Sequence, residues 1–309
     1  MNRLLASGFR PFAAALAVVA VAGTAHAAVP AAEHVIVVIM ENRSFSQVRS
    51  QPYTASLMSA GAWISGASAI GYPSQPNYLA LWSGSTQGVT TDACPAPGSP
   101  FNTPNLGQAI EAAGKTWRSY SENLAVAGAT DCSFDGDAVS GLYTRKHSPW
   151  SYFANVNHSN ERPYSDLAAD LAAGSLPNLT VVVPNNCHNT HDFYLDPTCS
   201  VPQGDAWLAA NVPPLIQALG PNDFLVLTWD EDDHNAGNNI LTVFAGPAIQ
   251  PATISSQYCT HYTVLRTIAD ALGVPAPGQA ATTYPLSGIW NALTPTRQSS
   301  WGRLKMLYR

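Results

Sequence analysis

Residues 34–45 read His-Val-Ile-Val-Val-Ile-Met-Glu-Asn-Arg-Ser-Phe, an apolar run from Val35 to Met40 that stops abruptly at Glu41 and Asn42. An apolar run of this length is typical of a strand that is buried on both faces of a parallel sheet. Ligands of open α/β sheets bind beyond the carboxyl ends of such strands. The sequence therefore places a carboxylate and an amide, two oxygen donors for a divalent cation, where α/β proteins bind their ligands.

A second acidic segment follows another apolar run. Phe224 to Leu227 leads into Thr-Trp-Asp-Glu-Asp-Asp-His at 228–234. If the two strands are parallel, their polar ends meet at one edge of the sheet, where a bound cation would relieve the repulsion between the acids. We predict one divalent metal ion of unknown identity, held by Glu41, Asn42, Asp230 and Glu231; the alternative is an acidic surface turn.

A possible nucleophile lies between these two segments. Ser74, in Tyr-Pro-Ser-Gln-Pro-Asn-Tyr at 72–78, stands at the start of a helix-like stretch. The N-terminus of a helix favours a bound phosphate and an alkoxide, so a serine next to a metal ion can attack phosphorus. Asn77 is predicted to donate to a phosphoryl oxygen. The alternative for Ser74 is an ordinary N-cap.

Apolar strand-like runs alternate with helical patterns along the chain, which predicts an α/β fold with a mostly parallel sheet. Further strands are expected at Leu179–Val183, Phe224–Thr228 and Leu241–Ala245. Helices are expected after the caps Thr103, Ser165, Asp205 and Thr260, with a kink or break at Pro213-Pro214. The spans 84–102 and 125–160 are expected to be long loops that shape a binding site.

The N-terminal 27 residues have the features of a secretory signal. Arg3 and Arg10 precede an apolar stretch that ends near Ala-His-Ala at 25–27. We therefore predict a signal peptide at 1–27, one large α/β domain at 28–309, a secreted or periplasmic location, and no stable membrane anchor. The net charge of −6, with only three lysines, excludes a basic stripe, so nucleic acid binding is not expected.

The chain has five cysteines, and in an oxidising compartment pairing is the default. Sequence does not fix the connectivity. Cys187 with Cys199 would close a short loop, Cys94 with Cys132 is the natural second pair, and Cys259 would be left over and buried.

Several motifs together resemble the bacterial phosphoesterase family, which includes phospholipases C and acid phosphatases and belongs to the alkaline phosphatase superfamily. They are Glu-Asn-Arg-Ser-Phe at 41–45, Pro-Ser-Gln-Pro-Asn-Tyr at 73–78, Tyr-Thr-Arg-Lys-His-Ser-Pro at 143–149, Thr-Trp-Asp-Glu at 228–231 and His-Tyr-Thr-Val-Leu-Arg-Thr-Ile at 261–268. The segment at 184–192 looks most like that of the secreted acid phosphatases. The resemblance implies a three-layer α/β/α sandwich with a mostly parallel central sheet, as in alkaline phosphatase.

The resemblance also implies roles for individual residues. Ser74 would be the nucleophile, and His191, beside Asp192, would face the phosphate. His147 and Arg145 would lie near the leaving group or the phosphoryl oxygens, and His261 would contact the substrate. Asn238-Asn239 stands where relatives often carry Asp-His, which favours one metal ion over two.

The sequence therefore predicts a secreted, metal-dependent acid phosphatase that hydrolyses phosphomonoesters through a phosphoserine. A phosphoinositide or a nucleotide would be a suitable substrate. One alternative is a phospholipase C-type phosphodiesterase. The other is a metal-stabilised secreted binding protein without turnover.

Overall fold

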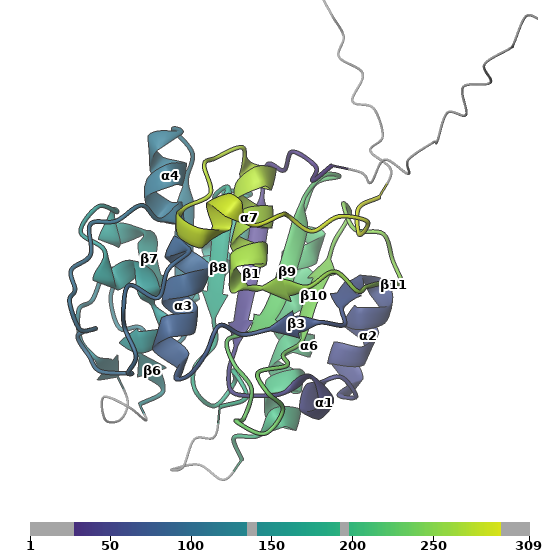
Figure 1. Cartoon of the computed structure of the whole chain (residues 1–309), viewed down its shortest axis with the longest axis horizontal. Coiled ribbons are helices and arrows are strands. Elements are labelled where there is room, and N and C mark those ends of the chain that lie inside the picture. Colours follow the sequence, from purple (N-terminus) through teal and green to yellow (C-terminus); the bar gives the residue numbers. More distant parts are fainter. Residues whose placement is uncertain (1–27, 135–140, 192–197, 292–309) are drawn as a thin grey trace, which may run out of the picture.

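The computed structural model describes residues 28–134, 141–191 and 198–291, so the predicted signal peptide at 1–27 lies outside the described residues. An eight-stranded sheet in the order β11-β2-β10-β9-β1-β8-β4-β7 forms the centre (Figure 1). Only β10 pairs antiparallel with its neighbours. The predicted mostly parallel sheet is confirmed.

The strands of the central sheet are short, and the middle ones are fully buried. They are β1 (Val35–Met40), β2 (Ala62–Ile64), β4 (Trp117–Ser121), β7 (Glu161–Pro163), β8 (Leu179–Val183), β9 (Phe224–Trp229), β10 (Thr242–Ala245) and β11 (Thr253–Ser255). Two small sheets pair β3 (Ala67–Ser68) with β12 (Cys259–Thr260) and β5 (Ser133–Phe134) with β6 (Tyr143–Thr144). The strands expected at 35–40 and 179–183 have these bounds, and the two others differ by one residue.

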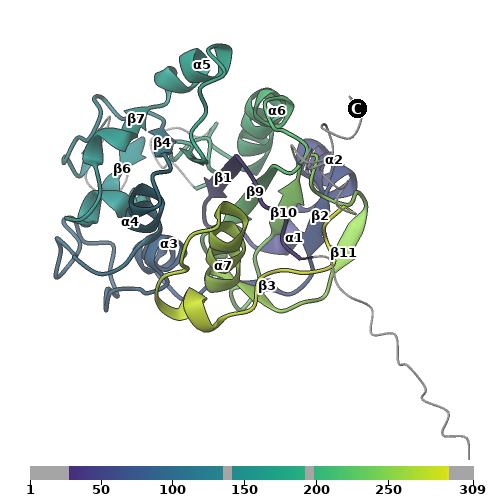
Figure 2. The same cartoon turned by 90° about the horizontal axis from the view of Figure 1, so that it is seen from above.

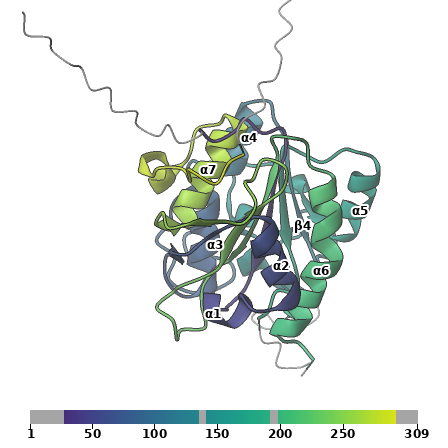
Figure 3. The ribbon, with the colours of Figure 1, turned by 90° about the vertical axis from the view of Figure 1, so that its right-hand side faces the viewer.

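Helices cover both faces of the sheet and give three layers (Figures 2 and 3). Helices α3 (Ser74–Ser83), α4 (Leu106–Ala112) and α7 (His261–Leu272) lie on one face, and α2 (Pro52–Ala60), α5 (Ser165–Ala172) and α6 (Val201–Gln217) on the other. Helix α1 (Phe45–Val48) follows β1, and short 3₁₀ helices span Arg145–His147, Pro149–Tyr152, His158–Asn160 and Gly278–Thr282. The α/β/α sandwich is confirmed.

Strand β1 is the central element of the site because β8 and β9 pair with it on its two sides, both parallel to it. Met40 pairs with Trp229, so the residues that follow β1 and β9 leave the sheet side by side. Every residue of β1 and β9 is buried, which explains why both strands are apolar except for Thr228, whose hydroxyl is hydrogen-bonded to that of Thr242.

The prediction for α6 is wrong at its start. The helix begins at Val201 after Ser200, whose side chain accepts from Gln203 N, and it continues through Pro213 and Pro214 without a break. Asp205 lies inside α6 and is buried. Its carboxylate accepts hydrogen bonds from the N–H groups of Tyr53 and Thr54, at 2.9 and 2.8 Å, and so caps the neighbouring helix α2.

Two other helix starts differ by one or two residues. The N-cap of α4 is Asn105, whose side chain accepts from Gln108 N, and Thr103 stands outside the helix. Helix α5 includes Ser165, which was expected to precede it. Helix α7 begins after Thr260 as predicted, and Gly273 ends it in the left-handed conformation that glycine tolerates.

The disulfides agree with the favoured pairing. Cys94 is bonded to Cys132 and Cys187 to Cys199. Cys259 is a free, buried cysteine, and burial raises the pKa of its thiol to about 12. Within the described ranges, no helix is long and apolar enough to cross a membrane.

The cap that α6 provides for α2 can be tested by removing the Asp205 carboxylate. We expect Asp205→Ala to lower the free energy of unfolding by about 2 kcal/mol, because buried N–H groups of Tyr53 and Thr54 lose a charged acceptor. Asp205→Asn, which keeps one oxygen acceptor, should lose less. Urea denaturation measures both, and equal stability of Asp205→Ala and the parent protein would contradict the assignment.

Candidate active site

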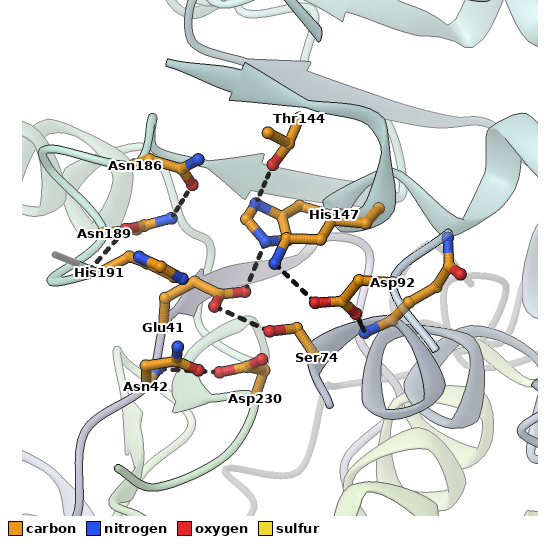
Figure 4. Close-up of polar contacts among 12 residues, drawn as sticks. Glu41, Asn42, Ser74, Asp92, Thr144, His147, Asn186, Asn189, His191 and Asp230 are labelled. Atoms are coloured by element: carbon orange, nitrogen blue, oxygen red, sulfur yellow. Dashed lines mark hydrogen bonds and ion pairs between the residues drawn. The ribbon is translucent and has the colours of Figure 1, made fainter. Parts of the chain in front are cut away.

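The ends of β1 and β9 bring the predicted acidic residues together at one sheet edge (Figure 4). Asp230 N donates to Met40 O at 3.0 Å, and Asn42 N donates to Asp230 Oδ1 at 3.1 Å. Glu41, Asp230 and Glu231 are almost completely buried. Asn42 has a φ of 49°, in the left-handed region that asparagine tolerates better than most residues.

Ser74 is the first residue of α3 and lies between two of these carboxylates. Its hydroxyl donates to Glu41 Oε2 at 3.2 Å or to Glu231 Oε1 at 3.4 Å. Pro73 holds the N-cap position, so Ser74 is not an ordinary N-cap. The buried hydroxyl therefore lies at the positive end of the helix, beside acidic groups that can accept its proton.

Asn77, one helical turn further on, holds the nucleophile segment to the acidic cluster. Its Oδ1 accepts from the N–H groups of Ile70 and Gly71, at 2.9 and 3.2 Å. Its Nδ2 donates to Glu231 Oε2 at 2.9 Å and to the carbonyls of Gly71 and Pro73. Here the amide positions Glu231 and the loop before Ser74; donation to a phosphoryl oxygen remains a prediction.

His147 contacts Glu41, one of the carboxylates of this cluster. Its Nε2 lies 3.0 Å from Glu41 Oε1, and its Nδ1 lies 3.1 Å from Thr144 Oγ1. The ring is buried and stacks on Tyr78 with centroids 5.0 Å apart. The short Nε2–Oε1 distance is not aligned as a hydrogen bond. The contact is an ion pair when the His147 ring is protonated.

The segment after β8 completes the wall around Glu41. Glu41 N donates to Asn189 O at 2.8 Å, and Thr190 Oγ1 donates to Glu41 O at 2.7 Å. His191 N donates to Asn189 Oδ1 at 2.9 Å, and the His191 ring lies beside Glu41 in Figure 4. Thr190 has a φ of 79°, a costly conformation for a β-branched residue, so this backbone is strained at the site. Asp192 lies outside the described residues.

The carboxylates of the cluster repel one another. Burial, then Glu41 and Glu231, raise the pKa of Asp230 well above its usual value. Burial, Glu41 and Asp92 raise the pKa of Glu231 to about 9. Burial would also raise the pKa of Glu41, but His147, Lys146 and His191 hold that pKa below its usual value. The site therefore holds more acidic groups than its side-chain cations compensate.

The side-chain oxygens of this cluster are of the chemical type that binds divalent cations. Among the described residues, Asn42 Oδ1, Asp230 Oδ2 and Glu41 Oε1 are buried oxygens without a hydrogen bond. Hard oxygen donors of this type bind divalent metal ions, and a cation would relieve the repulsion among the acids. In the same described part of the chain, no three His, Cys, Asp or Glu side chains already form a group that could hold a metal. The amide of Asn42 and the hydroxyl of Ser74 would have to contribute.

Two residues that were predicted to bind substrate, Arg145 and His261, contact other parts of the protein in this structure. Arg145 donates to Thr130 O, Ser151 O and Ser151 Oγ, and its guanidinium lies over the ring of Tyr152. These contacts fix the loop around the 3₁₀ helix at Arg145–His147. Substrate binding by Arg145 stays a prediction that no contact in the described structure supports.

His261 is the first residue of α7 and is completely buried. Its Nε2 lies 2.6 Å from Asp230 O, so the ring supports the backbone of the acidic strand end. Burial lowers the pKa of His261 to about 4, which keeps the ring neutral at physiological pH. This contact makes His261 a positioning residue for Asp230 in the described structure, and its contact with substrate stays a prediction.

The sequence analysis did not identify two groups of the site, Lys146 and Asp92. Lys146 Nζ lies 2.8 Å from Asp92 Oδ2, and Asp92 Oδ1 accepts from Gln75 N at 3.0 Å. Lys146 is buried, although it is a lysine in a loop rich in charges. The position of Lys146 next to His147 could have indicated its role. No feature of the sequence around Asp92 indicates a role for that residue.

Comparison with known proteins shows that this is an enzyme acting on phosphate esters. Residues 49–275 match the model of the phosphoesterase family, and this range contains Ser74, His147, Asp230 and Glu231. The chain belongs to the phosphoesterase family. The matched region begins after Glu41 and Asn42, which the structure nevertheless places against Ser74 and Asp230.

The chain is similar to several phosphatases. It is 38% identical over 272 residues to a phosphatidylinositol-3-phosphatase of Mycobacterium tuberculosis, covering 87% of this chain and 86% of that protein. It is 26% identical to an acid phosphatase of Aspergillus fumigatus and 25% identical to a phosphate-repressible acid phosphatase of Penicillium chrysogenum, over 78% of this chain in both cases. It spans only 55% and 59% of these two fungal proteins.

Solved structures confirm the alkaline-phosphatase-like fold. A protein of the alkaline phosphatase superfamily from Vibrio parahaemolyticus superposes with a TM-score of 0.59 at 14% identity, covering 82% of this chain and 70% of that chain. The phosphonate monoester hydrolase of Silicibacter pomeroyi gives a TM-score of 0.53 at 12% identity, covering 82% and 76%. At such low identity these likenesses concern the fold alone.

The positioning role of Asn77 leads to a test of its own. Asn77→Ala should lower both the free energy of unfolding, by about 2 kcal/mol, and the turnover number, because buried N–H and C=O groups of the loop lose their partners. Chemical denaturation and steady-state kinetics measure the two effects. A variant with parental stability and reduced turnover would instead indicate that Asn77 acts only on the substrate.

Proposed function

We propose that the protein is a metal-dependent phosphomonoesterase that acts outside the cytoplasm and transfers phosphate through Ser74. The observation that supports this most directly is the position of the Ser74 hydroxyl, within 3.4 Å of both Glu41 and Glu231 at the N-terminus of α3. Buried oxygens of Asn42 and Asp230 without hydrogen bonds lie at the same sheet edge. A serine hydroxyl must lose its proton to attack phosphorus, and the neighbouring carboxylates can accept that proton.

Glu41, Asn42, Asp230 and Glu231 would hold one divalent ion, with the Ser74 oxygen as a further contact. When bound, such an ion lowers the pKa of a coordinated hydroxyl and stabilises negative charge on phosphoryl oxygens. Burial and then the repulsion of Glu41 and Glu231 raise the pKa of Asp230, and the ion would compensate that repulsion. The identity of the ion stays open.

In the first half-reaction, Ser74 Oγ attacks the phosphorus in line with the leaving alcohol. The Oγ–P bond forms, the P–O bond to the alcohol breaks, and the hydroxyl proton passes to Glu231 or Glu41, its present hydrogen-bond acceptors. The positive end of the α3 dipole stabilises charge on the phosphoryl group, although the Gln75 N–H is already donated to Asp92 Oδ1 and Pro76 has none. Asn77 keeps Glu231 in place during this step.

The leaving alcohol needs a proton, and two histidines border the site. His147 is fixed by Thr144 and Tyr78, and His191 follows the strained residue Thr190. A protonated histidine would donate to the departing oxygen, which favours activity at acidic pH. Water then hydrolyses the phosphoserine, and inorganic phosphate leaves.

The relatives and the cysteines support the substrate class and the location. The similar protein of Mycobacterium tuberculosis is named for a phosphatidylinositol phosphate, a phosphomonoester on a ring alcohol. A phosphoinositide or another exposed phosphomonoester is therefore a suitable substrate. The two disulfides suit an oxidising compartment, as does the signal-like segment at 1–27.

Replacement of the nucleophile provides the central test. Ser74→Ala should reduce kcat/KM for p-nitrophenyl phosphate by about 10³-fold or more while leaving the melting temperature close to that of the parent protein. Acid quenching of the parent enzyme during turnover should trap phosphate on Ser74, detectable by peptide mass spectrometry. Ser59→Ala, a control at an exposed position of α2, should retain full activity. Parental activity in Ser74→Ala would exclude the mechanism.

Removal of the metal gives an independent test. Chelation should abolish phosphate release, and add-back of one of Mg²⁺, Ca²⁺, Mn²⁺ or Zn²⁺ should restore it. Elemental analysis should find one ion per chain, and Glu41→Gln and Asp230→Asn should lose it, whereas Asp233→Asn, on the same loop, should retain it. Full turnover after complete chelation would contradict metal dependence.

The same assay separates the alternatives. A phospholipase C would release phosphocholine from phosphatidylcholine faster than it releases phosphate from p-nitrophenyl phosphate. Bound metal without turnover of any phosphate ester would indicate a binding protein.

A further inference from the structure

Lys146 is a buried cation at the N-terminal turn of α3. Its side chain is 5% exposed, and its Nζ lies 2.8 Å from Asp92 Oδ2. The other oxygen of Asp92 accepts the backbone N–H of Gln75, the residue directly after Ser74. Through this carboxylate, the ammonium group is held against the turn that carries the nucleophile.

The charge of Lys146 acts on the groups that surround the Ser74 hydroxyl. It favours the charged forms of Glu41 and Glu231, the two carboxylates to which this hydroxyl can donate, although burial, Glu41 and Asp92 still raise the pKa of Glu231 to about 9. Burial disfavours the charge on Lys146, but Glu41 and Asp92 outweigh burial and raise its pKa, so it stays protonated. An ammonium group has three N–H donors, and Asp92 occupies one of them.

We propose that Lys146, positioned by Asp92, binds the second negative charge of a phosphomonoester and thereby makes the site prefer monoesters over diesters. The inference rests on the proposed phosphomonoesterase function and assigns its specificity to one residue. Near neutral pH a monoester carries close to two negative charges, because its second pKa is near 6, while a diester carries one. The extra charge requires an extra cation in a buried site.

The Arg145 guanidinium and a bound metal ion do not meet this requirement. The Arg145 guanidinium already donates to Thr130 and Ser151, away from Glu41. A divalent ion would be balanced by Glu41, Asp230 and Glu231 before any substrate arrives. Within the described ranges Lys146 forms one ion pair, with Asp92, and this carboxylate also accepts from the backbone of Gln75. Its remaining N–H donors can therefore balance the second charge of a dianion.

The test compares two esters with the same leaving group, p-nitrophenyl phosphate and bis(p-nitrophenyl) phosphate, at a pH where the monoester is a dianion. Lys146→Met should lower kcat/KM for the monoester about 10- to 100-fold, the effect of one lost charge-assisted contact, and change that for the diester less than about 3-fold. Lys146→Arg, which keeps the charge, should recover part of the monoester activity. Asp92→Asn should shift the same ratio, by a smaller factor.

A matched control is Lys115→Met, which removes a lysine before β4, at the end of the sheet away from the site. It should leave both activities unchanged. Inhibition of p-nitrophenyl phosphate hydrolysis by orthophosphate gives a second measurement, which also applies if the parent enzyme cleaves the diester too slowly to measure. Lys146→Met should weaken this inhibition about as much as it lowers monoester kcat/KM.

Equal losses on both esters would overturn the inference, because they indicate a structural role for Lys146. Unchanged monoester hydrolysis and unchanged inhibition by orthophosphate would overturn it as well. A parent enzyme that prefers the diester would contradict the proposed function itself, which the parent measurements show before any variant is made.

Discussion

The repulsion among buried carboxylates at the ends of β1 and β9 is the constraint on which the site depends. Glu41, Asp230 and Glu231 are brought together because the two strands are parallel neighbours and leave the sheet in register. Neighbouring buried carboxylates are stable only when cations, hydrogen bonds or protonation compensate their charges. The surrounding elements provide such compensation: His147 and Lys146 near Glu41, Asn77 on Glu231, and the N–H of Asn42 on Asp230.

The acidic residues at the sheet edge could be predicted from the sequence because the pattern that identifies them, an apolar run followed by polar residues, is local. An apolar run that ends in Glu41-Asn42, and another that ends in Asp230-Glu231, can be read without any tertiary information. The strand bounds, the parallel sheet and the contact of Ser74 with the acids agree with that analysis. The motifs shared with the phosphoesterase family then indicated that segments far apart in the chain belong to one site.

The sequence analysis failed where a residue serves a distant element. Asp205 has the chemistry of an N-cap and was assigned to its own helix, but it caps α2 across the helical layer. Asp92 lies in a long loop with no periodic pattern, and only the fold brings it to Gln75 and Lys146. The contact of the His261 ring with the carbonyl of Asp230 was likewise not predicted from the sequence. Tertiary partners of this kind leave no trace in local spacing.

The two disulfides restrain loops that the sheet itself does not hold. Cys94 follows Asp92 by two residues, and its partner Cys132 accepts the backbone N–H of Arg145, next to Lys146. Cys187 and Cys199 tie the segment after β8, with Asn189 and Thr190, to the start of α6.

The contact of α6 with this segment is equally restrictive. A Cβ at Gly204 would lie 2.5 Å from Thr190 Cγ2 and 2.9 Å from His188 O, so glycine allows the helix to approach the strained backbone. The strain at Thr190 is tolerated because its hydroxyl donates to Glu41 O and accepts from Trp229 Nε1. Helix α6, the disulfide and β9 thus hold in place the backbone that carries Glu41 and His191, which lets a site built largely on loops keep the precision that phosphoryl transfer requires.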